Sequence, residues 1–382
     1  MAASTEHSRK RRSRSTDVQG ASAALQKLAP LEFAQSWDNV GLLAGDTGAR
    51  VRRILLCIDL GPDVLEEALA AKVQMIAAYH PPIFKPVSRL VWPAPASEAA
   101  VHRCIANGIA VYSMHTALDA ADGGTNDCLA QLCGIQETLP LEHADVGAAE
   151  CKVVVFVPPG DTERVADAMF AAGAGRIGDY ERCSFRIPGT GTFFGTESTA
   201  PVVGQPGRLE HAEEIRLEAV CPATCLPALV EAVVREHPYE EPAFDIYPLK
   251  SRPAQGIGRI GRLPRPVTLL SLARKLKRAA GAECTTLVGE PNRKVRRAVI
   301  VAGAAGSLPF RVSLDRHDVI ITGEIRHHDA LAIRRRDCSA IALSHWSSER
   351  PALNALAARL CALLPGVEAV ISKRDREPFQ RA

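Results

Sequence analysis

Two stretches of this sequence, 230 residues apart, share one arrangement: Ile109-Ala-Val-Tyr-Ser-Met-His115 and Ala340-Ile-Ala-Leu-Ser-His345. Each is a short apolar run that ends in a histidine, and a carboxylate follows four residues later, as Asp119 and as Glu349. A third apolar run, Met75-Ile-Ala-Ala-Tyr-His80, also ends in a histidine. Imidazole and carboxylate groups gathered at strand ends suit a hydrolytic divalent metal. The separation along the chain predicts one site, built by folding two distant halves together.

The sequence around these runs alternates between apolar strands and amphipathic helices, after a short helix over Ala24–Ala29. The expected strands are Ile54–Ile58, Val73–Ala78 and Ile109–Met114 in the first half, and Arg297–Val301, Val319–Thr322 and Ile341–Leu343 in the second. Near-continuous apolar strands that alternate with helices predict a mostly parallel α/β sheet.

The pattern changes near residue 150. The segment from Cys151 to Leu249 reads strand, helix, two strands, helix, strand, which is the order of a ferredoxin-like α+β unit. A Pro- and Gly-rich stretch, Pro248 to Pro264, leads back to the α/β pattern. We therefore expect an α/β body interrupted by an insert. The predicted divisions are a disordered basic tail (1–17), an N-terminal half of the body (18–150), the insert (151–249) and a C-terminal half (250–382).

Composition excludes several classes of protein. The chain has 382 residues, of which 47% are hydrophobic and 23% charged, as in an ordinary globular protein. Its first 20 residues hold five basic and two acidic side chains, and this excess equals the net charge of +3, so the remainder is neutral. A neutral body gives no general case for nucleic-acid binding, and a solvated tail is favoured over a nucleic-acid contact through Arg9–Arg14.

The cysteines and the apolar runs indicate the cellular compartment of the protein. There are 11 cysteines, an odd number without any Cys-x-x-Cys pair, so a disulfide framework is not expected. No apolar run approaches the roughly 20 residues that span a bilayer, and no apolar segment follows the N-terminal charges as in a secretory signal. These features predict a cytoplasmic protein without membrane contact.

The candidate site residues are polar side chains that follow the predicted strands. Ligands of open parallel sheets collect beyond the carboxyl ends of the strands. The residues found there are Asp59, His80, His115 with Asp119, Glu324, and His345 with Glu349. Taken singly, Asp119 reads as a loop acid near a helix and Glu349 as a first-turn glutamate favoured by the helix dipole. Several such groups at one edge favour a metal site, and those positions would hold the carboxylates rigidly.

Two further features were weighed at this edge. His327 and His328 are neighbours on a predicted helix and point in different directions, so no more than one is expected to enter the site. Gly303-Ala-Ala-Gly-Ser307 follows a strand and would cradle a phosphate at a helix N-terminus. A plain strand-to-helix turn looks the same and is the favoured interpretation.

Combined motifs in this chain resemble the Nif-three-like family, also labelled GTP cyclohydrolase 1 type 2 homologues. They are Ser36-Trp-Asp-Asn-Val-Gly-Leu-Leu43, Tyr79-His-Pro-Pro-Ile-Phe-Lys85, His115-Thr-Ala-Leu-Asp-Ala120, Gly124-Thr-Asn-Asp127, Ile321-Thr-Gly-Glu324 with His327-His328, and His345-Trp-Ser-Ser-Glu349. The insert resembles the PII/CutA-like domain of the longer members, through motifs such as Gly189-Thr-Gly-Thr-Phe-Phe194 and His237-Pro-Tyr-Glu-Glu-Pro242. The resemblance covers about residues 18 to 375.

The resemblance implies two similar α/β halves that hold a dinuclear divalent metal centre, in a chain that assembles as a homohexamer. The family's ligands fall here on Tyr79, His80, Asp119, His345 and Glu349. Tyr79 departs from the pattern, because the family has a histidine there and a neutral phenol is a poor ligand. Three explanations stay open: Tyr79 coordinates as phenolate, His115 or a water substitutes for it, or that metal binds weakly.

The activity that the resemblance implies is metal-dependent hydrolysis, by a water that one or two Zn, Mn or Fe ions activate. The substrate would be GTP, opened at its guanine ring, or a phosphoester. Glu324, His115 or His327 would transfer protons, and no organic cofactor is expected. The alternative is a non-enzymatic metal-binding scaffold or regulator, whose insert binds a small molecule or a partner.

Overall fold

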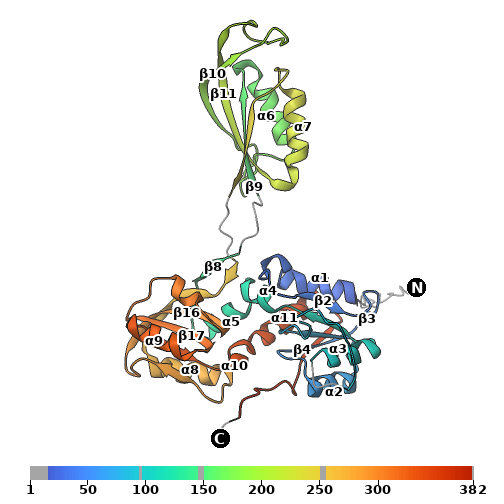
Figure 1. Cartoon of the computed structure of the whole chain (residues 1–382), viewed down its shortest axis with the longest axis vertical. Helices are drawn as coiled ribbons and strands as arrows, with labels where there is room; N and C mark the ends of the chain where they lie inside the picture. The colour runs from blue at the N-terminus through green and yellow to red at the C-terminus, as the bar shows by residue number, and fades with distance from the viewer. Residues whose placement is uncertain (1–15, 94–96, 145–149, 250–254, 381–382) are drawn as a thin grey trace, which may run out of the picture. The chain divides into compact units, whose positions relative to one another are not determined.

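The computed structural model describes residues 16–93, 97–144, 150–249 and 255–380 (Figure 1). The chain forms two compact units: Met1–Asp145 with Pro253–Ala382, here called the body, and Val146–Arg252, here called the insert. The predicted basic tail lies outside the described residues except for its last two. These form strand β1 (Thr16–Asp17), which pairs with β3 (Arg50–Val51).

Helix α1 (Val18–Leu28) starts earlier than the short helix expected over Ala24–Ala29. Asp17 caps it, because the Asp17 side chain accepts a hydrogen bond from the Gly20 backbone N–H at 2.7 Å. This cap satisfies a backbone donor that the helix itself leaves without a partner. Ala21 to Ala24 favour a helix, and the Asp17 cap with the packing of Val18 and Ala21 sets its start at Val18.

The first sheet of the body has the order β19-β4-β5-β6-β2. Its strands are β2 (Gly41–Ala44), β4 (Arg53–Cys57), β5 (Met75–Ala78), β6 (Ala110–Ser113) and β19 (Glu368–Ile371). Strands β19, β4, β5 and β6 are parallel, and β2 is antiparallel to β6. Helices α1 and α11 (Ala352–Leu363) cover one face, and α2 (Pro62–Ala70) and α3 (Ser97–Ala106) cover the other. Burial on both faces explains why these strands are largely apolar, with charged residues such as Arg53 and Glu368 at their first positions.

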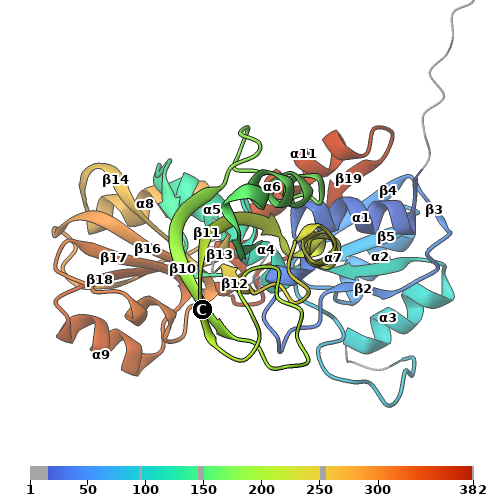
Figure 2. The ribbon, with the colours of Figure 1, turned by 90° about the horizontal axis from the view of Figure 1, so that it is seen from above.

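The second sheet has the order β15-β18-β17-β16-β14-β7. Figure 2 shows its strands β14, β16, β17 and β18 side by side. Its strands are β7 (Thr138–Leu139), β14 (Arg259–Thr268), β15 (Thr286–Val288), β16 (Lys294–Ala304), β17 (Asp318–Glu324) and β18 (Ser339–Ala342). Only β16, β17 and β18 are parallel, so the expectation of a mostly parallel sheet is wrong here. The cause is β14, which begins inside the Pro- and Gly-rich stretch that reads as a linker. Helices α5 (Thr125–Cys133) and α8 (Leu269–Ala280) cover one face, and α9 (His327–Arg335) the other.

The two sheets exchange elements between the N-terminal and C-terminal parts of the chain. Helix α5 and strand β7, from the N-terminal part of the chain, join the second sheet. Helix α11 and strand β19, from the C-terminal part, join the first. Arg259 of β14 strengthens this link, because its buried guanidinium donates to Asp127 of α5 at 2.5 and 2.9 Å. The exchange makes both parts of the chain one body.

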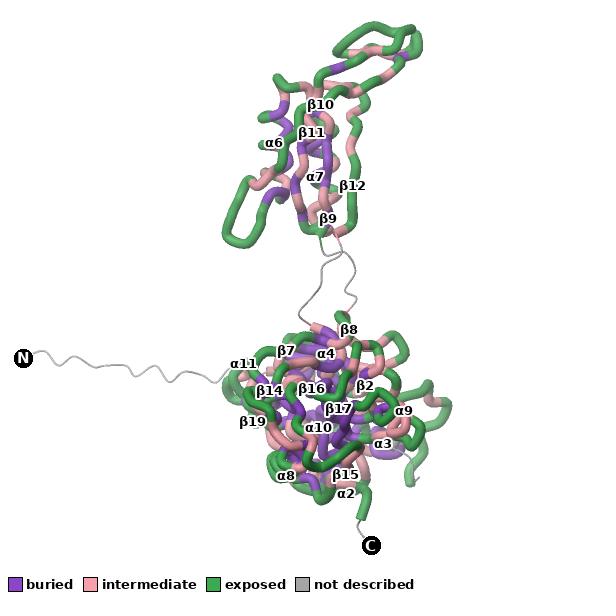
Figure 3. The backbone as a smooth tube through the Cα atoms, turned by 90° about the vertical axis from the view of Figure 1, so that its left-hand side faces the viewer, coloured by how far each residue is buried: buried purple, intermediate pink, exposed green. Residues whose placement is uncertain are grey.

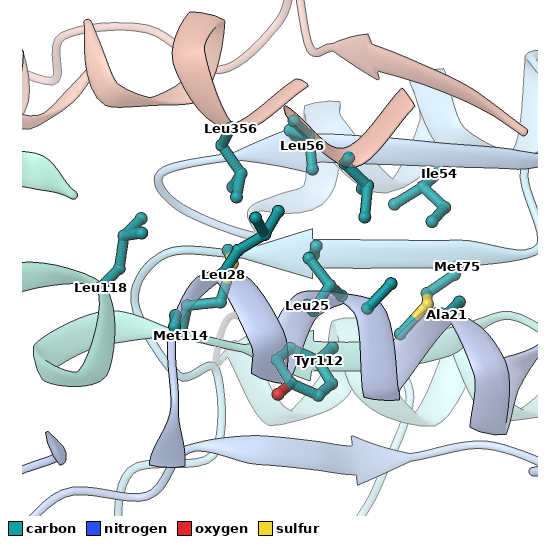
Figure 4. Close-up of a cluster of buried hydrophobic side chains, with 14 of the residues drawn as sticks. Ala21, Leu25, Leu28, Ile54, Leu56, Met75, Tyr112, Met114, Leu118 and Leu356 are labelled. Atoms are coloured by element: carbon teal, nitrogen blue, oxygen red, sulfur yellow. The ribbon is translucent and has the colours of Figure 1, made fainter. Parts of the chain in front are cut away.

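The core of the first sheet combines residues from both ends of the chain (Figure 4). Leu25 of α1 and Leu356 of α11 pack with Ile54, Leu56 and Tyr112 of the strands, and all are at most 2% exposed. Figure 3 shows buried backbone running through the interior of each unit. Each fully buried leucine or isoleucine contributes about 1.5–3 kcal/mol of transfer free energy. The chain is therefore a mixed α/β protein whose core needs both halves.

The insert has one antiparallel sheet with the order β10-β11-β9-β12. Its elements follow the chain as β9 (Glu150–Val157), α6 (Thr162–Ala171), β10 (Phe185–Phe194), β11 (Leu209–Pro222), α7 (Leu226–Glu236) and β12 (Phe244–Leu249). Helices α6 and α7 pack on one face of the sheet through residues such as Val165, Met169 and Leu229. A short pair, β8 (Glu142–His143) with β13 (Gly256–Ile257), lies in the body where the chain leaves it and returns. Within the described residues, no helix is long and apolar enough to cross a membrane.

Candidate metal centre

Three side chains from both sheets of the body meet at one point: His80, His345 and Glu349. Their ligand atoms all lie within 4.8 Å of one another. His345 Nε2 is 3.1 Å from Glu349 Oε1, and His80 Nε2 is 3.5 Å from Glu349 Oε2. Two imidazoles and one carboxylate are a common ligand set of catalytic divalent metals. The carboxyl ends of the parallel strands therefore hold a candidate metal centre.

Local backbone geometry presents these groups. His80 comes two residues after β5, and His345 begins the short helix α10 (His345–Glu349) directly after β18. Positions i and i+4 of a helix lie on one face, so Glu349 is brought beside His345. Ser344 makes the sharp turn from strand to helix with a φ of 103°, and its hydroxyl accepts from the Ser347 N–H at 3.1 Å. A non-glycine residue in this region is strained and needs such support.

Carboxylates behind the two histidines orient the rings. His80 Nδ1 is 2.9 Å from Asp59 Oδ1, and His345 Nδ1 is 2.9 Å from Glu324 Oε1. Asp59 follows β4 and Glu324 ends β17, so each lies on the strand next to that of its histidine. With Nδ1 occupied, Nε2 of both rings faces Glu349. This is the carboxylate–histidine arrangement that fixes the tautomer of metal-binding histidines.

The electrostatics of the centre favour positive charge between these groups. Burial opposes the charged form of His80, but contacts with Asp59 and Glu349 outweigh it and raise the pKa of His80 to about 10. Contact with Glu349 likewise raises the pKa of His345 to about 9. Burial of Glu349 acts against its ionisation, but His345 and His80 keep its pKa below the ordinary value. A buried anion between two imidazoles is an environment that a cation stabilises.

Two observations show that a cation fits. Glu349 is 3% exposed, and its Oε2 atom has no hydrogen-bond partner among the described residues. A buried carboxylate oxygen without a partner is costly unless a cation or water satisfies it. Gly303, at the end of β16, leaves the necessary room, because a Cβ there would lie 2.4 Å from Glu349 Oε1 and 3.1 Å from His345 Nε2. In the sequence Gly303 reads as part of a strand-to-helix turn, which does not reveal this role.

Tyr79 and Asp119, the other two predicted ligands, form a pair of their own beside the centre. The Tyr79 hydroxyl donates a short hydrogen bond to Asp119 Oδ1. Burial and the Asp119 charge raise the pKa of Tyr79 well above its ordinary value, and burial raises the pKa of Asp119 to about 6. Asp119 is not one of the three grouped residues His80, His345 and Glu349, although the Glu349 charge acts on the pKa of both Asp119 and Tyr79.

His115, a predicted catalytic residue, begins α4 (His115–Ala120) and lies at the side of the centre. Its ring is 5.3 Å from that of His80 between centroids. His115 Nδ1 is 2.9 Å from Asp38 Oδ1, and Asp38 also accepts from Thr116. Burial opposes ionisation of Asp38, but these bonds lower its pKa. Asp38 was missed as a site residue, although it belongs to the Ser36–Leu43 motif.

The remaining predictions have different outcomes. Glu324 orients His345, as described above. His327 begins α9, and its ring contacts that of His328 at 5.5 Å between centroids. Among the described residues, no hydrogen bond or ion pair joins His327 to the three-residue group. After Gly303 the chain makes only a four-residue 3₁₀ turn (Leu308–Arg311), so the proposed phosphate cradle has no α-helix behind it.

Comparison with known proteins identifies the family. The family model described as Duf34/NIF3 (NGG1p interacting factor 3) matches residues 16–378. The chain belongs to the DUF34/NIF3 family. Among curated relatives, a Bacillus subtilis protein named GTP cyclohydrolase 1 type 2 homolog is 31% identical over 359 residues, which cover 93% of this chain and 95% of that protein. A Mycobacterium tuberculosis protein of the same name is 35% identical over 331 residues, 86% of each chain.

Solved structures of DUF34/NIF3 relatives share the architecture. A Bacillus cereus protein related to NIF3 has a TM-score of 0.73 at 30% identity, covering 97% of this chain and all of the other. Staphylococcus aureus protein SA1388 has a TM-score of 0.78 at 25% identity, covering 96% of this chain and 99% of that one. The predicted family membership is confirmed.

Proposed function

We propose that this DUF34/NIF3 protein is a metal-dependent hydrolase whose divalent ion binds to His80, His345 and Glu349. The observation that carries the proposal is the convergence of His80 and His345 on the buried Glu349 carboxylate, whose Oε2 lies 3.5 Å from His80 Nε2 and has no hydrogen-bond partner among the described residues. An ion there would supply Lewis acidity and activate water near neutral pH. Zn, Mn and Fe all accept this mixture of nitrogen and oxygen ligands.

The chain's own residues prepare this site. Asp59 and Glu324 hold the imidazoles so that Nε2 points inward, which reduces the cost of ordering the ligands when an ion binds. Glu349 is buried and rigid on the last residue of α10. Glu324 and His115 are the candidates for proton transfer, since both lie against the histidines of the centre.

A nucleotide is the substrate class that best agrees with the surroundings. The names of the relatives refer to GTP cyclohydrolase. Trp37, which is 58% exposed, lies 6.0 Å from the His115 ring and 6.0 Å from Phe84, between centroids. Exposed aromatic rings beside a polar site suit the face of a nucleobase. GTP ring opening and phosphoester hydrolysis are therefore the first activities to examine.

The test is metal content together with turnover. Protein purified without chelators is loaded with Zn, Mn or Fe and assayed with GTP and with a phosphodiester. We expect bound metal and metal-dependent turnover in the wild type, and neither in Glu349→Ala. Glu66→Ala, which changes an exposed glutamate of α2, is the matched control and should keep both. Wild-type protein that binds no ion after loading would rule out the hydrolase.

One observation favours the alternative, a metal-binding regulator. The insert contains a hollow of about 500 Å³ with aromatic and acidic walls. Its lining includes Phe156, Phe193, Phe194, Glu214 and Tyr239. Such walls suit a small organic cation. Absence of turnover, with a ligand that raises the unfolding temperature of the wild type but not of Tyr239→Ala, would favour this role.

The proposal extends to the oligomeric state of the protein and to the fold types of its two units. We expect the two sheets of the body to be similar halves, the insert to be a ferredoxin-like domain of the PII/CutA type, and the chain to form a homohexamer in the cytoplasm. The equivalent placement of α4 and α10 after parallel strands supports the first of these points. Light scattering of the purified full chain tests the hexamer, because a dimer or monomer would contradict it.

A further inference from the structure

Tyr79 occupies a fixed position between the metal centre and the hydrophobic core. Its side chain is 1% exposed and belongs to the core cluster that also contains Met114 and Leu118. Its backbone N–H donates to Cys57 O at 2.8 Å, and its carbonyl accepts from the Ser113 hydroxyl at 2.9 Å. The ring is therefore held by packing and the backbone by neighbouring strands. Tyr79 cannot turn toward a new partner without disturbing the sheet.

The hydroxyl of this fixed ring is already used. It donates its only hydrogen to Asp119 Oδ1. A metal ion bound by both residues would have to displace that hydrogen from between the two oxygen atoms. At Glu349 Oε2 no such bond has to be broken, because this oxygen has no hydrogen-bond partner among the described residues.

The same pair separates Asp119 from the centre in function. One carboxylate oxygen of Asp119, Oδ1, is occupied by the neutral Tyr79 donor, whereas the Glu349 carboxylate faces two imidazoles. Asn126 holds the other end of the residue, since its side-chain amide donates to the Asp119 carbonyl at 3.0 Å. Asp119 is thus anchored at both its backbone and its side chain.

We propose that the Tyr79–Asp119 hydrogen bond closes the position of a second metal ion, so that this chain binds a single ion on His80, His345 and Glu349. This inference rests on the proposed function, because it counts the ions at the same site. It departs from the dinuclear centre that the family resemblance implies. A histidine at position 79 would present a nitrogen lone pair where the tyrosine presents a hydrogen, and would release Asp119 for coordination.

The experiment counts manganese ions per chain. Wild-type protein and Tyr79→His are saturated with Mn²⁺, freed of excess metal, and analysed by elemental analysis and electron paramagnetic resonance. We expect one ion and an isolated Mn²⁺ spectrum for the wild type, and two ions with a spin-coupled spectrum for Tyr79→His. Tyr79→Phe keeps the ring without the hydroxyl and should still bind one ion, because it adds no ligand.

Ultraviolet difference spectra of the wild type provide a second measurement that needs no variant. Coordination by Tyr79 would produce a tyrosinate band when metal is added, and we expect none. Two ions in the wild type, with a tyrosinate band or a loss of one ion in Tyr79→Phe, would overturn the inference and leave the hydrolase standing. A folded Tyr79→His protein with one ion would also overturn it. No ion in any of the proteins would instead remove the proposed function.

Discussion

Helices α4 and α10 carry the same pair of groups in the same local setting, yet they use them differently. Each helix begins at a histidine directly after a parallel strand, and each has a carboxylate four residues later. In α10, His345 and Glu349 face one another and share a third ligand, His80. In α4, His115 bonds to Asp38 and Asp119 bonds to Tyr79. Equal spacing has produced two candidate ligands in one case, and in the other two side chains that bond to different partners.

The difference lies in the neighbours. Both turns hold a non-glycine residue at positive φ, 25° at His115 and 103° at Ser344, so the strained backbone is common to both. Around Glu349, strand β16 supplies Gly303 and therefore space. Around Asp119, the adjacent strand supplies the Tyr79 hydroxyl and therefore a hydrogen-bond donor. A sequence motif fixes the direction of a side chain, and its neighbour decides what that side chain binds.

The largest expected effect comes from neutralising each carboxylate in turn. Glu349→Gln keeps the shape but removes the charge from the buried carboxylate that lies between the His80 and His345 rings. Metal affinity should fall by more than about 100-fold, beyond the cost of losing a supporting group. Asp119→Asn should reduce affinity far less, because Asp119 already bonds to Tyr79. Isothermal titration with Mn²⁺ measures both, and equal losses would contradict the difference between α4 and α10.

Space beside Glu349 can be removed without changing a ligand. In Gly303→Ala the new methyl group would meet Glu349 Oε1 at 2.4 Å and His345 Nε2 at 3.1 Å, at a φ of 63°. We expect metal binding to be lost. Gly306→Ala is the matched control, because Gly306 has a similar φ of 53° and nothing within 4 Å of the added carbon. It should show only the strain, about 1–2 kcal/mol in the free energy of unfolding, with metal affinity retained.

The pH dependence of metal affinity and of stability should be set by His80 and His345, the histidines that face Glu349 of α10. The folded metal-free protein holds protons on His80 and His345 up to pH values of about 10 and about 9, given their raised pKa. Their contribution to stability is complete below the unfolded pKa of about 6.5 and is lost as pH rises through the folded values. Metal must displace these protons, so its affinity should rise with pH, by up to about tenfold per unit for each proton released.

Titrations with Mn²⁺ at pH values from 6 to 8 test this slope, and thermal unfolding without metal tests the stability. His115→Gln should keep the slope, since His115 bonds to Asp38 and lies outside the ligand group. A slope that disappears in this variant would place His115 among the ligands. An affinity independent of pH would mean that the two histidines do not carry protons in the metal-free protein.

Much of the fold and part of the site could be read from the sequence. The apolar strands, their α/β alternation and the motifs at their ends predicted the family and placed His80, His345 and Glu349 at one edge. Local patterns could not predict β14, whose prolines and glycines read as a linker, or β19, which pairs with β4 more than 300 residues earlier. Such pairings depend on tertiary packing, which periodicity does not record.

The roles of Asp38, Gly303 and the Tyr79–Asp119 pair were hidden for a similar reason. Each depends on one contact between segments far apart in sequence: Asp38 with His115, Gly303 with Glu349, Tyr79 with Asp119. Composition and spacing identify groups that are able to bind metal. Only the three-dimensional arrangement shows which of them have already found another partner.

The smallest expected effect concerns the carboxylates behind the histidines. Asp59 orients His80 and Asp38 orients His115, with the same 2.9 Å separation from Nδ1. Loss of such a support behind a ligand costs about 10- to 100-fold in metal affinity. Asp59→Asn should therefore weaken Mn²⁺ binding by about tenfold, because the amide can still accept a hydrogen bond but lacks the charge. Asp38→Asn should leave the affinity unchanged while lowering turnover, if His115 acts only in proton transfer. If Asp59→Asn and Asp38→Asn weakened Mn²⁺ binding equally, His115 would be a ligand, and α4 and α10 would use their histidines in the same way.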